Sequence, residues 1–219
     1  MSVDYPEGKG LAVLPAPITA GISHLAASGD FVEGNATLTA LLIALSSLLY
    51  TTVGQAGGTA FVAVMALLAF PPEEIRPTSL TINIVAAAYA TWRLHRSGAI
   101  DWRLLRDVLF ASLPTAFVGG LLILDGPLYL IITGTLLLLA AVLMVLRASA
   151  DWITARSIPK HWTALVGALC GFLSGLTGVG GGVFLAPLII VLGWASPRQA
   201  AGLSAPFILA NSIVGLAGV

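Results

Sequence analysis

Charged residues are scarce in this chain of 219 residues, because only 9% of them are Asp, Glu, Lys or Arg. A soluble domain usually carries about 25% charged residues, whereas 58% of this chain is hydrophobic and its mean hydropathy is +0.97. We therefore predict an all-α, polytopic integral membrane protein and exclude a water-soluble enzyme. Ten basic and ten acidic residues give a net charge of zero, which argues against a nucleic-acid partner.

Cysteine and histidine are also rare. The one cysteine, Cys170, excludes a disulfide framework and a cysteine-ligated metal cluster, and His95 and His161 are too few to bind zinc. A hydrolase acting within the membrane would need a nucleophile and a base in contact. Ser174 would be the candidate nucleophile, but every histidine lies in a charged loop or near the N-terminus. We therefore expect a protein that is not an enzyme and has no metal or other cofactor.

Long runs without charge make up most of the chain after residue 36. Residues 1–36 are less apolar and predict an extramembrane or interfacial lead-in. A membrane-spanning helix needs about 20 apolar residues, which the runs 107–124 and 127–147 supply if Asp107 and Arg147 are taken as charged end residues. The run 183–194 would reach only about 18 Å as a helix, so we predict a half-helix there. The remaining charge-free runs are 37–53, 58–70, 78–92, 163–177 and 203–219.

Basic residues predict the orientation of the chain in the membrane. Seven of the ten basic residues lie in two connections, whereas the 71–77 loop and the turn at 125–127 together hold one arginine. By the positive-inside rule, both basic connections face the cytoplasm, and we expect a multi-pass protein of the cell (inner) membrane. The seven residues are Arg93, Arg96, Arg103, Arg106, Arg147, Arg156 and Lys160.

An internal repeat becomes visible when the chain is shifted against itself by 124 residues. Residues 39–68 then align with 163–192, and ten of the thirty pairs are identical, including Gly54/Gly178, Gly57/Gly181 and Gly58/Gly182. We predict two homologous repeats with glycine-broken short helices, over 37–147 and 163–219. The second copy ends about 52 residues before the counterpart of residue 147, which predicts that its C-terminal helices are missing.

The relative orientation of the two repeats depends on how each broken pair of helices crosses the membrane. If each pair returns to the side from which it enters, three crossings separate the copies and the repeats are inverted, as in many secondary transporters. If each pair is one continuous crossing, the repeats are parallel. The short run 183–194 favours the inverted arrangement.

Two glycine clusters, at residues 52–59 and 177–182, lie at equivalent places in the predicted repeats. A broken helix at membrane depth is tolerated only where it is buried in protein or lines a cavity. The helix that starts after each break directs backbone N–H groups and a positive dipole end into that space, which favours an anion. We therefore predict a substrate-binding site at Gly54, Gln55, Gly57, Gly58, Thr59, Ser79, Asn83, Thr177, Gly178, Gly180, Gly181, Gly182, Ser204 and Asn211.

Close packing is the alternative explanation for single residues of this set. Small residues four apart, such as Gly171 and Gly175, let membrane helices approach each other. Hydrogen bonding between helices would equally explain Asn83 and Asn211. Charged residues are absent from the core of every apolar run, so a titratable proton relay has no candidate in the sequence.

The paired clusters Gly54–Gly58 and Gly178–Gly182, together with residues 113–120, resemble the TauE/SafE family of membrane anion transporters over residues 37–219. The resemblance implies transport, often export, of sulfur-containing anions such as sulfite, sulfoacetate or thiosulfate. Its expected partners are a small anionic substrate and the lipid bilayer, and homo-oligomer formation stays open. The alternative function is a non-transporting membrane subunit that anchors partner enzymes through its basic loops.

Overall fold

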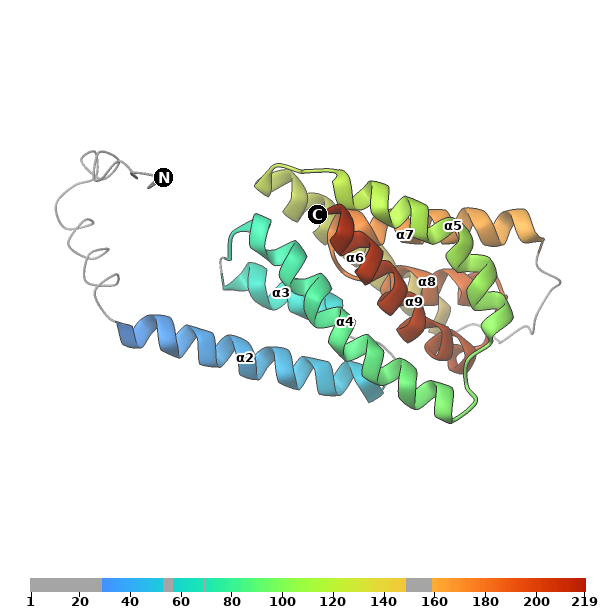
Figure 1. Ribbon diagram of the computed structural model, residues 1–219, viewed down its shortest axis with the longest axis horizontal. Helices are drawn as coiled ribbons and strands as arrows, with labels where there is room; N and C mark the ends of the chain where they lie inside the picture. Colours follow the sequence, from blue (N-terminus) through green and yellow to red (C-terminus); the bar gives the residue numbers. More distant parts are fainter. Residues whose placement is uncertain (1–28, 53–56, 69, 149–158) are drawn as a thin grey trace. The chain divides into compact units, whose positions relative to one another are not determined.

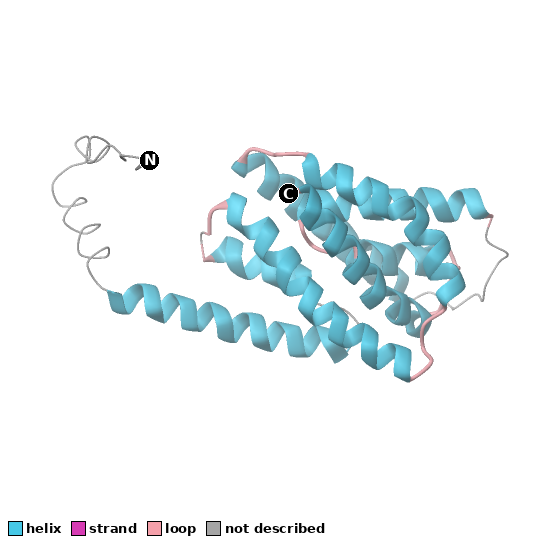
Figure 2. Ribbon diagram, viewed as in Figure 1, coloured by secondary structure: helices cyan, strands magenta, loops and turns pink. Residues whose placement is uncertain are grey.

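The computed structural model describes residues 29–52, 57–68, 70–148 and 159–219. Within these ranges the chain is helical and contains no strand (Figure 2), which confirms the predicted all-α class. The helices in chain order are α2 (Gly29–Thr52), α3 (Gly58–Leu67), α4 (Pro72–Arg96), α5 (Trp102–Leu121), α6 (Gly126–Ala148), α7 (Lys160–Thr177), α8 (Gly182–Val191) and α9 (Pro197–Gly218) (Figure 1).

The chain divides into two compact units, Met1–Leu41 and Leu42–Val219. The described part of the first unit is the beginning of α2, which starts at Gly29 and therefore inside the stretch predicted as a lead-in. The second unit contains the remainder of α2 and the helices α3 to α9. Its hydrophobic core includes Phe61, Leu185 and Phe207, which are almost completely buried.

Local sequence signals determine where α5 and α9 begin. The side chain of Asp101 accepts hydrogen bonds from the backbone N–H groups of Arg103 and Leu104, at 3.0 and 3.1 Å. Ser196 and Gln199 form a reciprocal capping box at the start of α9. Both arrangements satisfy N–H groups that the first turn of a helix leaves unpaired.

The start of α4 corrects one prediction. The sequence predicts a loop over 71–77, but α4 begins at Pro72 and includes Arg76. Proline is favourable at the first position of a helix because its missing N–H group needs no partner there. Glu73 and Glu74 in the first turn further favour the helix, since negative charge stabilises the positive end of its dipole.

Three of the described helices are long and apolar enough to cross a membrane, namely α5, α9 and residues Gly126–Leu143 of α6. Large apolar side chains such as Phe110 and Val145 are exposed on the surface, as expected of helices that face lipid. The helix α8 has ten residues, in agreement with the predicted half-helix. These features confirm the predicted polytopic membrane architecture.

Small residues bring α5 and α7 into close contact. A Cβ atom built on Gly171 would overlap the backbone carbonyl of Ser112, and one built on Gly175 would overlap that of Ala116. The contact advances by four residues along both helices in the same direction, so α5 and α7 are parallel. Close packing therefore explains Gly171 and Gly175.

The helix α9 also runs parallel to α5. Near its start a Cβ atom on Gly202 would overlap the carbonyl of Ala99, and near its end one on Gly218 would lie 2.6 Å from the carbonyl oxygen of Phe117. Because α7 and α9 point the same way, α8 carries the chain back toward the end at which α7 begins. This direction agrees with a broken pair that returns to its own side, and the inversion of the two repeats stays a prediction.

Candidate functional site

Two short helices follow the glycine clusters. The bounds of α3 (Gly58–Leu67) and α8 (Gly182–Val191) differ by the same 124 residues that relate the clusters in the sequence. Each is preceded by a glycine in the left-handed conformation, Gly57 with φ +94° and Gly181 with φ +74°, which strains any other residue. Among the described residues, no side chain caps either helix start and neither first turn contains an acidic residue, so the positive end of each dipole is open to an anion.

The two glycine breaks meet at Asn83 on α4. A Cβ atom built on Gly58 would overlap the carbonyl oxygen of Val179 and lie 2.6 Å from Nδ2 of Asn83. A Cβ atom on Gly180 would lie 3.1 Å from the same nitrogen. Nδ2 of Asn83 also donates a hydrogen bond to the carbonyl of Gly178 at 3.4 Å. The fold therefore brings together residues from both predicted clusters, which we call the glycine junction (Gly58, Asn83 and residues 178–181).

Four buried polar atoms at or beside the glycine junction have no hydrogen-bond partner among the described residues. A Cβ atom on Gly180 would lie 3.3 Å from Oγ of Ser212, and one on Gly181 would lie 2.9 Å from Cβ of Ser174. Most buried polar groups in proteins are paired, so a group of unpaired ones indicates a place for water or a ligand. The four atoms are Ser79 Oγ, Asn83 Oδ1, Ser174 Oγ and Ser212 Oγ, all on side chains with 0% exposure.

Asn211, another predicted site residue, is engaged within the protein. Its Oδ1 accepts a hydrogen bond from the Ser112 hydroxyl at 2.6 Å, and its Nδ2 donates to the Phe207 carbonyl at 2.9 Å. Asn211 thus links α9 to α5, which supports the alternative explanation of hydrogen bonding between helices.

The remaining predicted residues have other surroundings. Gly182 packs against Ile208, because a Cβ atom there would lie 2.5 Å from Cδ1 of that side chain. Gly54 and Gln55 lie outside the described residues. Internal hydrogen bonds occupy the hydroxyls of Thr59, Thr177 and Ser204, which donate to the Tyr50 hydroxyl (2.9 Å), the Leu173 carbonyl (2.7 Å) and the Ala200 carbonyl (2.8 Å).

Arg76 is a buried residue that the sequence pattern does not indicate, because the prolines and charges of 71–77 predict a loop. Its side chain is only 8% exposed. Its Nη1 donates to the carbonyl of Leu122 at 2.7 Å, and its Nη2 donates to the carbonyls of Gly119, at 2.8 Å, and Gly120. The signal that could have found it is its spacing of three and seven residues from Ser79 and Asn83, which places all three on one face of a helix.

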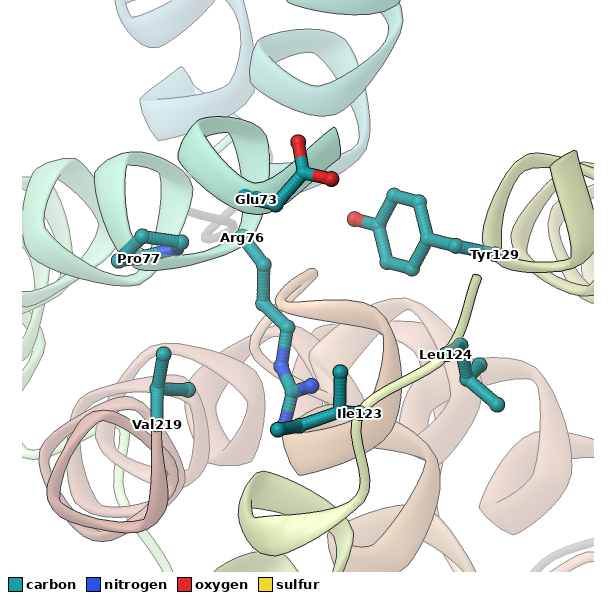
Figure 3. A pocket seen from close by; sticks show the side chains of 7 residues that line it. All are labelled: Glu73, Arg76, Pro77, Ile123, Leu124, Tyr129 and Val219. Atoms are coloured by element: carbon teal, nitrogen blue, oxygen red, sulfur yellow. The ribbon is translucent and has the colours of Figure 1, made fainter. Parts of the chain in front are cut away.

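A pocket of about 220 Å³ lies beside Arg76 (Figure 3). On its wall, the Tyr129 hydroxyl donates a hydrogen bond to the carbonyl of Thr177 at 2.7 Å. A Cβ atom on Gly178 would lie 3.0 Å from Cγ of Arg76, so the pocket adjoins the second glycine break. The lining residues are Glu73, Arg76, Pro77, Ile123, Leu124, Tyr129 and Val219.

Comparison with protein families agrees with this architecture. The sulfite exporter TauE/SafE family matches residues 38–219, which include α3 to α9 and the whole glycine junction. The chain belongs to the TauE/SafE family. No solved structure gives a significant match to this TauE/SafE protein.

Three curated relatives of this TauE/SafE protein are named probable membrane transporter proteins. The relative from Sinorhizobium fredii is 38% identical over 78% of this chain and 71% of its own length. Those from Haemophilus influenzae and Methanocaldococcus jannaschii are each 28% identical, over 82% and 64% of this chain and over 70% and 53% of their own lengths. The family match, the names of these relatives and the helices that can cross a membrane together indicate a multi-pass membrane transporter.

Proposed function

We propose that this TauE/SafE protein exports small sulfur-containing or organic anions, of the sulfite, sulfoacetate and thiosulfate class, across the cell (inner) membrane. The observation that carries the proposal is the meeting of both glycine breaks at Asn83, where a Cβ atom on Gly58 or on Gly180 would lie within 3.1 Å of its Nδ2. The starts of α3 and α8, which have no described side-chain cap, would then both stabilise the same bound anion through their positive dipole ends.

The chemistry of the glycine junction favours an anion over a cation. Its polar groups are the Asn83 amide and the backbone, and the hydroxyls of Ser79, Ser174 and Ser212 lie at or beside it. Asp, Glu and His, which carry metals or protons, are absent from these described residues. Hydroxyl and amide N–H groups donate hydrogen bonds to an oxyanion without binding it so strongly that it cannot leave. Such neutral donors suit a substrate that must be released on the other side.

The membrane potential is a sufficient driving force for export. An anion that leaves a cell with a negative interior gains about 2.3 kcal/mol per charge for each 100 mV, which sustains roughly a fortyfold concentration gradient. We therefore propose efflux driven by the potential and without an obligatory proton partner.

Proteoliposomes that contain the full-length protein test this function. Vesicles are loaded with sulfite, sulfoacetate or thiosulfate labelled with ³⁵S, and a potassium gradient with valinomycin imposes the potential. Flux of at least one anion is expected to follow the sign of the potential and to be unaffected by a pH gradient at zero potential.

The control and the contradicting outcomes use the same vesicles. Protein-free liposomes define the leak. Anion accumulation driven by the pH gradient alone would reject the uncoupled mechanism, and leak-level flux of all three anions would reject anion export and support the membrane-anchor alternative.

A further inference from the structure

Arg76 is a buried cation without an acidic partner in the described part of the chain. The ion pair recorded among the described residues joins Arg106 and Asp107, near the start of α5, whereas Arg76 bonds to carbonyls at the end of α5. Glu73 lies one turn before Arg76, but in Figure 3 its carboxylate and the Arg76 guanidinium point in opposite directions. Because burying an unpaired charge is costly, the pocket beside Arg76 favours an anion as its occupant.

The contacts of the guanidinium hold it in place without using all of its donors. Three N–H groups of Arg76 bond to the carbonyls of Gly119, Gly120 and Leu122, at the negative end of the α5 dipole. A guanidinium has five N–H donors, and Nε of Arg76 has no partner among the described residues. An oxyanion is the natural acceptor for the unused donors of a group that is already oriented.

A line of polar side chains connects Arg76 with the glycine junction. Arg76, Ser79 and Asn83 lie on one buried face of α4, with exposed fractions of 8%, 0% and 0%. The Ser79 hydroxyl and Nε of Arg76 are donors without a partner in the described structure. Nδ2 of Asn83 makes one long bond, of 3.4 Å, to the Gly178 carbonyl. At 1.5 Å per residue the line is about 10 Å long, a distance that a small anion covers in a few steps.

We propose that the pocket lined by Arg76 and Tyr129 is a second anion-binding subsite, in which the guanidinium binds a small oxyanion on its path along Ser79 and Asn83. This inference rests on the proposed function of the glycine junction as an anion path. The volume of about 220 Å³ accommodates a tetrahedral oxyanion with part of its water shell. By the predicted orientation, the subsite lies at the outward end of α4.

A pair of substitutions at Ile123 tests the subsite without disturbing Arg76. This side chain is 94% exposed, lines the pocket and lies beside the guanidinium in Figure 3. Ile123→Asp places a tethered carboxylate next to the cation, where it competes with the substrate. Ile123→Asn has the same size and no charge, so it is the matched control.

The expected result is a KM for anion flux that is about tenfold higher in Ile123→Asp than in Ile123→Asn, since a charge-assisted hydrogen bond is displaced. Binding is measured separately, as the rise in melting temperature of the detergent-solubilised protein with sulfite, sulfoacetate or thiosulfate at constant ionic strength. We expect that rise in the wild type and in Ile123→Asn, and a reduced rise in Ile123→Asp.

A second comparison removes the cation itself. Arg76→Gln is expected to raise KM in the same way, whereas Arg96→Gln, at the opposite end of α4 and over the Trp92 ring, leaves KM unchanged. Arg76→Gln removes the three hydrogen bonds from Arg76 to carbonyls at the end of α5 and could prevent membrane insertion. In that case the comparison of Ile123→Asp with Ile123→Asn still tests the subsite.

Two results would separate the failure of this inference from that of the proposed function. Equal KM values and equal melting shifts for Ile123→Asp and Ile123→Asn, with robust wild-type flux, overturn the subsite alone. Leak-level wild-type flux overturns anion export, and the melting shifts then show independently whether the pocket binds an oxyanion.

Discussion

The two short helices that follow the glycine clusters resemble each other in the described structure, but the side chains around them differ. The helices α3 and α8 have the same length and the same left-handed glycine N-cap. The helices that follow, α4 and α9, each carry a serine at the eighth position, Ser79 and Ser204. The fifth position, however, is Arg76 in α4 and Ala201 in α9.

The hydrogen bonds of these side chains differ as well. Ser79 and the Oδ1 atom of Asn83 have no partner in the described structure, whereas Ser204 bonds to its own helix and Asn211 bonds to Ser112. Two short helices of the same length and N-cap are thus followed by helices whose polar residues have different roles. On α4 the polar residues face the glycine junction and the pocket, and on α9 most of them hold helices together.

The largest effect is expected from leucine at the two N-cap glycines. Gly57→Leu and Gly181→Leu should each abolish anion flux while the protein still inserts, because both positions have positive φ and adjoin the junction. Flux in proteoliposomes and insertion in membranes are the measurements. If one variant keeps wild-type flux, its break does not take part in the path, and the two regions differ more than proposed.

Gly134→Leu is the matched control for this experiment. Gly134 lies on α6, and a Cβ atom there would meet nothing within 4 Å. The same change of side chain should therefore leave flux and stability nearly unchanged.

Alanine at the two asparagines should give different kinds of defect. Asn83→Ala removes a donor from the glycine junction, so we expect KM to rise about tenfold. The melting temperature should fall less than in Asn211→Ala, because the bond from Asn83 to the Gly178 carbonyl is long, at 3.4 Å. Asn211→Ala leaves the buried Ser112 hydroxyl unpaired, which destabilises the fold by about 1–3 kcal/mol and leaves KM unchanged. The measurements are KM and the melting temperature in detergent, and the same defect in both variants would contradict the division of roles.

A smaller difference is expected for alanine at the N-cap glycines. Both Gly57→Ala and Gly181→Ala force a side chain into the left-handed conformation, at a cost of about 1–2 kcal/mol. A Cβ atom on Gly57 meets the outer ring atom of the Phe61 side chain at 3.0 Å, whereas one on Gly181 meets Cβ of Ser174 at 2.9 Å and the Cys170 carbonyl at 3.1 Å. The melting temperature should therefore fall further for Gly181→Ala, and a larger fall for Gly57→Ala would contradict this packing.

Cysteine labelling tests the predicted orientation of both regions and should not alter flux. In a Cys170→Ala background, Ser97→Cys and Ser157→Cys should react only from the cytoplasmic side, and Gly126→Cys only from outside. Ser97 lies at the end of α4 and Gly126 at the start of α6, while Ser157 lies outside the described residues. Opposite accessibility of Ser97 and Ser157 would rule out the inverted repeat.

The sequence by itself determined the membrane class, the places where the helices break and the equivalence of the two short helices. These features depend on local composition, because apolar length decides what crosses a bilayer and glycine decides where a helix can adopt positive φ. The first and last residues of α8 therefore lie 124 positions after those of α3, as the glycine clusters in the sequence predict.

Only the tertiary structure decided which polar groups are paired. The stretch 71–77 has three prolines and three charged residues, a composition that predicts a loop, but Arg76 is buried because it bonds to carbonyls 43 to 46 residues later in the chain. Asn83 and Asn211 look alike in the sequence, and they differ because Ser112, 99 residues from Asn211, occupies one of them. Local sequence determines where helices begin and end, whereas contacts between distant segments determine which buried groups remain available to a ligand.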